Sequence, residues 1–77
     1  MNTQRLFNVV LLEWSTEKLK IEDDLERVIA SGDDINDKSH RIKQLVDRLT
    51  TVEANIEKFN SMVSVNNNEN NEKEKQN

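Results

Sequence analysis

Apolar residues recur at every seventh position through most of the chain. These positions are Phe7, Trp14, Ile21, Val28, Ile35, Ile42, Leu49, Ile56 and Val63. Only 34% of the residues are hydrophobic, so an unbroken run of this length is not expected by chance. A seven-residue apolar repeat is typical of helices that bury one stripe against another helix. The pattern therefore predicts long helices that pack on each other.

A second stripe, apolar except for two lysines, changes its offset from the first in the middle of the chain. It lies four residues after the first stripe in one half and three residues after it in the other. Its members are Leu11, Lys18 and Leu25, then Lys38, Leu45, Val52 and Phe59. The two halves mirror each other about a point between Ser31 and Gly32, as the arms of an antiparallel hairpin must. The predicted facing pairs are Val28/Ile35, Leu25/Lys38, Ile21/Ile42, Lys18/Leu45, Trp14/Leu49, Leu11/Val52 and Phe7/Ile56.

The predicted fold is therefore all-α, an antiparallel helical hairpin over residues 1–63 with coiled-coil-like heptad packing. We expect a first helix over about 3–30, a turn over about 31–33 and a second helix over about 34–63. Gly32, the only glycine, is expected to take the left-handed conformation that ends a helix. Asp33 or Asp34 is expected to cap the second helix, because short acidic side chains accept hydrogen bonds from the free N–H groups there.

A continuous rod is the alternative fold. In a parallel pair of rods Glu13 would face Lys18 of the other chain, and Arg48 would face Glu53, and both contacts are attractive. Residues 64–77 are expected to form a disordered tail rich in Asn, Glu and Lys, because from position 66 onward nothing apolar is available to offset the entropy of ordering.

Several apolar residues lie outside the two stripes, mostly towards the open end of the hairpin. With Trp14 they form the predicted protein interface, which comprises Leu6, Val10, Leu12, Trp14 and Leu19. A chain of 77 residues buries little surface by itself and this one has no cysteine to form disulfides. We therefore expect it to form homo-oligomers, to complete a helical bundle with helical segments of another protein, or both.

The charges argue against most other classes of function. The net charge is −4 and no segment has a basic surplus, so binding to nucleic acid is unlikely from the sequence. The alternative is a nucleic-acid-binding regulator built as a dimer of hairpins, in which Lys38, Arg41, Lys43 and Arg48 would contact phosphate. No membrane partner is expected, since the longest apolar run, residues 9–12, is far shorter than the ~20 residues that span a bilayer.

Catalysis and metal binding lack the residues that they require. The single histidine, His40, has Ser39 as its only neighbouring candidate nucleophile. Adjacent residues on a helix do not face each other, so the two cannot form a catalytic pair. The acidic clusters lack the glycine and the spacing of a calcium loop. We therefore expect no enzyme activity, no catalytic residue, no metal and no cofactor. The preferred function is a cytoplasmic protein-protein interaction module, such as an assembly, scaffolding, chaperone-like or regulatory subunit.

Overall fold

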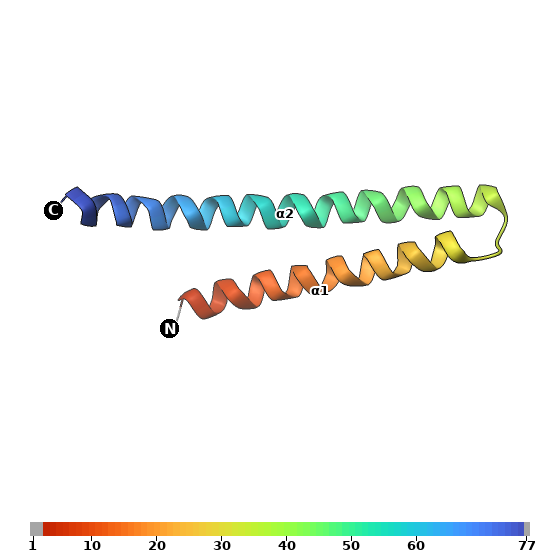
Figure 1. Ribbon diagram of the computed structural model, residues 1–77, viewed down its shortest axis with the longest axis horizontal. Helices are drawn as coiled ribbons and strands as arrows, with labels where there is room; N and C mark the ends of the chain where they lie inside the picture. The colour runs from red at the N-terminus through yellow and green to blue at the C-terminus, as the bar shows by residue number, and fades with distance from the viewer. Residues whose placement is uncertain (1–2, 77) are drawn as a thin grey trace.

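Two antiparallel helices, α1 (Thr3–Ala30) and α2 (Ile35–Gln76), form a hairpin in the computed structural model. The structure describes the backbone of residues 3–76 and the side chains of residues 3–64. Its longest dimension is 64 Å, which is about the length of a straight 42-residue helix at ~1.5 Å per residue. α2 thus sets the length of the molecule, and α1 runs back along one side of it (Figure 1). The hairpin is confirmed and the continuous rod is wrong.

α2 extends further than the end expected at about residue 63. Its backbone is helical to Gln76, and the segment contains neither proline nor glycine that would interrupt a helix. The side chains of residues 65–77 lie outside the described part of the chain. The disorder expected for residues 64–77 therefore stays a prediction.

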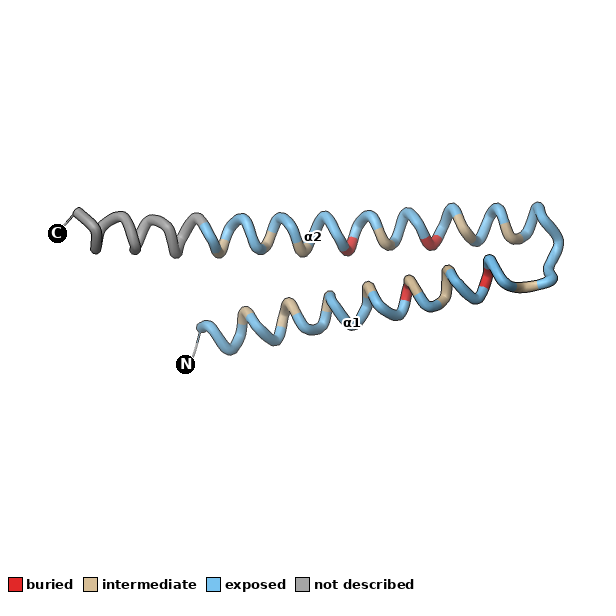
Figure 2. The backbone as a smooth tube through the Cα atoms, viewed as in Figure 1, coloured by how far each residue is buried: buried red, intermediate tan, exposed pale blue. Residues whose placement is uncertain are grey.

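The core lies between the helices in the half of the hairpin nearest the turn (Figure 2). Its buried members are Ile21, Val28, Leu45 and Val52, and partly buried side chains packed against them are Trp14, Leu25, Ile42, Leu49 and Ile56. All nine occupy the two stripes that the sequence defines. The stripes therefore identify the faces by which α1 and α2 contact each other.

The open end of the hairpin is filled by aromatic rings. The helices lie closest near the turn and diverge towards the N-terminus of α1 (Figure 1). Phe59 makes edge-to-face contacts with Phe7, at 5.4 Å between ring centroids, and with Trp14, at 5.6 Å. Aromatic side chains span a wider gap than aliphatic ones and favour this geometry. These three residues therefore continue the contact where the helices separate.

The register of the hairpin differs from the one that the predicted facing pairs imply. Phe7 and Trp14 both contact Phe59, which lies beyond their predicted partners along α2. The Lys18 ammonium lies 3.4 Å from the Glu53 carboxylate, again beyond its predicted neighbour. The observed partners lie three, ten and eight residues beyond the predicted ones, so α2 is displaced along α1 relative to the prediction. The same two stripes still face each other, because the core residues all belong to them.

Ile35 shows the consequence of this shift. The sequence predicted that it would pack against Val28, but Ile35 is 78% exposed while Val28 is buried. The connection from Ser31 to Asp34 carries the chain past the end of α1 before α2 begins (Figure 1), so the Ile35 side chain stays exposed. Ile35 therefore does not belong to the seam of the hairpin.

Candidate interaction surfaces

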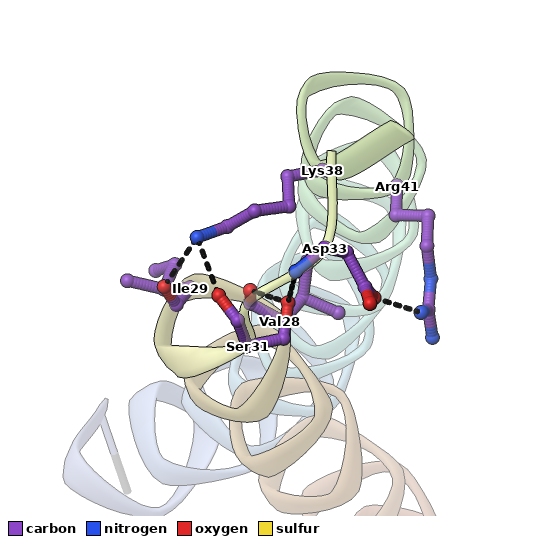
Figure 3. Close-up of polar contacts among 6 residues, drawn as sticks. All are labelled: Val28, Ile29, Ser31, Asp33, Lys38 and Arg41. Atoms are coloured by element: carbon purple, nitrogen blue, oxygen red, sulfur yellow. Dashed lines mark hydrogen bonds and ion pairs between the residues drawn. The ribbon is translucent and has the colours of Figure 1, made fainter. Parts of the chain in front are cut away.

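The turn is closed by side chains rather than by the backbone of Gly32. The Lys38 ammonium donates hydrogen bonds to the carbonyl oxygens of Ile29 and Ser31, both at 2.9 Å (Figure 3). The Ser31 hydroxyl donates to the carbonyl oxygen of Val28 at 2.8 Å. These carbonyls are at the C-terminus of α1, where helical partners run out and a cation is favoured by the helix dipole. Lys38 is thus a cap for α1.

Two predictions about the turn are therefore wrong. Gly32 does not have a positive φ angle, and the carbonyl oxygens at the end of α1 accept hydrogen bonds from the Lys38 and Ser31 side chains. Lys38 does not lie across the seam from Leu25, because it reaches over the end of α1. The expected cap of α2 is confirmed at Asp34, whose carboxylate accepts a hydrogen bond from the Asn36 N–H at 3.1 Å.

A groove between the helices near the turn gathers arginines from both of them. Its floor includes the apolar side chains of Val28 and Leu45. Its charged lining consists of Arg27, Arg41, Arg48, Asp24 and Asp47. Arg27 also pairs with Asp23 at 3.0 Å, and Arg41 lies 3.9 Å from Asp33. The lining includes carboxylates beside the three arginines, so it does not present the one-sided positive field that phosphate binding requires.

The four residues of the alternative phosphate-binding hypothesis are not brought together. Arg41 and Arg48 line this groove, but Lys38 caps α1 and Lys43 is not part of the lining. Arg27, which the sequence analysis did not include, joins the two arginines from α1. Arg27 is far from Arg41 and Arg48 in the sequence, so the sequence contained no signal that would group the three.

The predicted interface residues divide into two groups. Leu6, Leu12 and Leu19 are exposed, with 49%, 66% and 67% of their surface accessible. Val10 and Trp14 are half-buried, and the Trp14 ring packs against Phe59 inside the hairpin. The exposed leucines are therefore the part of the predicted interface that remains available for another molecule.

An exposed apolar stripe runs along α1 on the side away from α2. The apolar Val9, Leu12 and Leu19 and the polar Thr16 between them are all exposed, and their spacing of three and four residues places them on one face of the helix. The residues that contact α2 lie on the opposite face. We call these four residues the outer stripe. Val9 and Thr16 were missed in the sequence analysis, although the same periodicity argument applied to the second face would have found them.

Two further findings on the described residues concern membranes and metal ions. Within the described residues, neither helix contains a stretch long and apolar enough to cross a membrane. In the same residues, no three or more histidine, cysteine, aspartate or glutamate side chains gather where they could hold a metal ion. No protein-family model, curated protein or solved structure shows a significant match to this chain.

Proposed function

We propose that this protein is a non-enzymatic interaction module that binds another α-helix through the outer stripe of α1. The exposure of Leu12 and Leu19, about two-thirds for each side chain, is the observation that carries the proposal. Isolated exposed leucines are ordinary, but several exposed apolar side chains on one face of a helix often mark an interface. A helix with apolar residues on two faces is typically buried on both.

The expected partner is a helix that carries a matching apolar stripe. The outer stripe follows the spacing by which helices interdigitate their side chains. Its centre has no charge, whereas charged residues lie towards its ends. The hairpin would then act as a rigid support, with α2 holding α1 in its helical form by packing against the inner face.

The expected affinity is modest. Burying a Val or Leu side chain that is about half to two-thirds exposed contributes about 1–2 kcal/mol, so three such side chains from each partner contribute about 6–12 kcal/mol. Association costs about 4–15 kcal/mol in lost freedom. These magnitudes correspond to a dissociation constant in the micromolar range or weaker. Such an interaction suits reversible assembly rather than a permanent complex.

Site-specific photocrosslinking in cells tests this proposal. We would introduce p-benzoylphenylalanine at Leu19 and, as a matched control, at Lys20, which is also exposed but points about 100° away around the helix. The position-19 probe should give discrete adducts whose crosslinked peptide lies on a helix, whether of this chain or of another. Equal adduct patterns at the two positions would refute a role for the outer stripe.

A further inference from the structure

Ile35 is the most exposed of the large apolar side chains that the structure describes. It is 78% exposed, although it belongs to the first stripe, whose neighbouring members Val28 and Ile42 pack in the core. The seven-residue repeat runs through the connection between the helices without interruption. A helix that continued from α1 into α2 would therefore carry Ile35 on the same face as Val28 and Ile42.

Ile35 also lies at the centre of the observed register. Three contacts define that register, namely Phe7–Phe59, Trp14–Phe59 and Lys18–Glu53. The midpoint in sequence of each pair falls within two residues of Ile35. Two identical antiparallel helices that made these contacts with each other would be related by a two-fold axis at that midpoint. Ile35 of one copy would then face Ile35 of the other.

We infer that two copies of this chain form a domain-swapped dimer, in which the connection becomes helical and each α1 packs against the α2 of the other copy. The mirrored stripes require an antiparallel α2 beside α1, and one chain or two can supply it. The contacts of the hairpin are then made between chains, which is the low-cost route to a dimer that swapping offers. The hairpin remains the form of the single chain. The outer stripe stays exposed in both forms, so the dimer does not depend on the proposed function.

The connection has a backbone that can become helical. None of its four residues, Ser31 to Asp34, has a positive φ angle, and the chain contains no proline. Opening the hairpin breaks the Lys38 hydrogen bonds to the carbonyl oxygens of Ile29 and Ser31, but both oxygens then accept from backbone N–H groups four residues later. Gly32 is unfavourable inside a helix. The connection therefore favours the hairpin at low protein concentration and permits the dimer at high concentration.

The residues around Ile35 suit the close approach of two helices. At ~100° per residue, the side chains within about 60° of Ile35 are Ser31, Gly32, Lys38 and Ser39. Three of these are small, and Lys38 of one copy lies at the level of Ser31 and Gly32 of the other. The two Lys38 side chains are six residues apart along the axis, about 9 Å. The centre of the dimer is therefore an apolar contact between small residues, with the two cations separated.

The other charged side chains near the axis point away from the facing helix. Asp33 and Asp37 lie about 160° around the helix from Ile35. Arg41 lies about 120° from it, and Asp34 about 100°. The repulsion between the Asp34 side chains of the two copies is thus carried through solvent, and salt screens it. We therefore expect the dimer at physiological rather than at low ionic strength.

Single cysteines in the full chain test for the swap, since the chain has none. Lys18→Cys and Glu53→Cys replace two side chains whose charged ends lie 3.4 Å apart across the seam. The two variants are mixed in urea, refolded together at physiological ionic strength and oxidised, so that a disulfide joining position 18 to position 53 must link two chains. Its fraction should rise with protein concentration, because it forms only where α1 packs against the α2 of another copy.

Two matched controls accompany this test. Glu17→Cys in place of Lys18→Cys should lose the disulfide, because position 17 is exposed and points about 100° away from position 18. Ile35→Gln, added to both cysteine variants, should weaken the dimer at least about tenfold, because it removes apolar contact from both copies. Ile29→Gln should leave the dimer unchanged, because Ile29 is 56% exposed but lies about 120° from Ile35 around the helix.

Three outcomes would overturn the swapped dimer. They are the absence of the interchain disulfide at millimolar protein concentration, equal effects of the two glutamine substitutions, and a dimer in sedimentation equilibrium that lacks the disulfide. The last outcome would favour the association of closed hairpins instead. Far-UV circular dichroism of every variant confirms that the helices are intact. Photocrosslinking from position 19 decides the proposed function separately, since the outer stripe is not part of the swapped contacts.

Discussion

Replacing Lys38 with methionine should destabilise the hairpin although Lys38 lies at its edge. The ammonium donates to two carbonyl oxygens at the C-terminus of α1, those of Ile29 and Ser31, at 2.9 Å each. Methionine keeps a long unbranched stem but cannot donate to a carbonyl. The substitution therefore removes the cap while leaving the bulk of the side chain in place.

The magnitude follows from the two hydrogen bonds and their exposure. A hydrogen bond from a charged donor contributes about 1.5–3 kcal/mol when it is well shielded, and a cation at a helix C-terminus contributes about 0.3–1 kcal/mol at the surface. Lys38 is half-buried and its bond to Ile29 is exposed, so water replaces part of the lost interaction. We expect a loss of about 1–2 kcal/mol in the free energy of unfolding. In a chain of this size that corresponds to about 4–15 °C in Tm.

Thermal and urea denaturation followed by circular dichroism at 222 nm would measure this loss. Lys43→Met is the matched control, because Lys43 is exposed on the same helix and its ammonium makes no hydrogen bond or ion pair that is defined in the described part of the chain. The control should change Tm by less than 2 °C or so, as is usual for surface substitutions. If the two variants lose equal stability, or if neither does, the assignment of Lys38 as the cap of α1 is refuted.

Three further substitutions test the turn, the aromatic end and the register. Gly32→Ala should raise the free energy of unfolding by about 0.4–1 kcal/mol in urea denaturation, because φ is not positive and an added methyl group meets no atom within 4 Å; a loss of stability would contradict the described turn. Phe59→Ala should lower the free energy of unfolding by about 2–4 kcal/mol, and Phe59→Leu by about 1 kcal/mol, because only the alanine removes most of the apolar contact with Phe7 and Trp14. The alanine variant should also shift Trp14 fluorescence to the red. Unchanged fluorescence would contradict the contact. Ile35→Gln should change the free energy of unfolding by less than about 0.5 kcal/mol, whereas Ile42→Gln should lower it by at least ~2 kcal/mol, since only Ile42 packs against the core. Equal losses in thermal melts would favour the mirrored register that the sequence predicted.

The candidate interface could be predicted from the sequence only in part. The exposed positions of Leu12 and Leu19 follow from the helical period, once the stripes that face α2 are known. The sequence alone could not assign Trp14 to the seam or to the interface, because its position in the first stripe and its size suit either role. The ring of Phe59 places it inside the hairpin, and that contact depends on how far α2 is displaced along α1.

The sequence by itself determined the features that depend on nearby residues. Two long helices follow from the apolar period, the break near Gly32 follows from the reversal of that period, and the cap at Asp34 follows from the chemistry of a short acidic side chain. Each of these depends on residues within a few turns of one another. The faces by which α1 and α2 meet were determined in the same way.

Only the tertiary structure decided the register. A seven-residue repeat looks the same after a shift of one heptad, so the stripes can specify which faces meet but not which residues face each other. The turn removes this ambiguity, because α2 begins at Ile35 behind its cap Asp34 and Lys38 reaches back over the end of α1 to bond its last carbonyl oxygens. That contact joins two helix ends across the connection. The apolar pattern carries no information about it, since the bond is made by a charged side chain to backbone carbonyls.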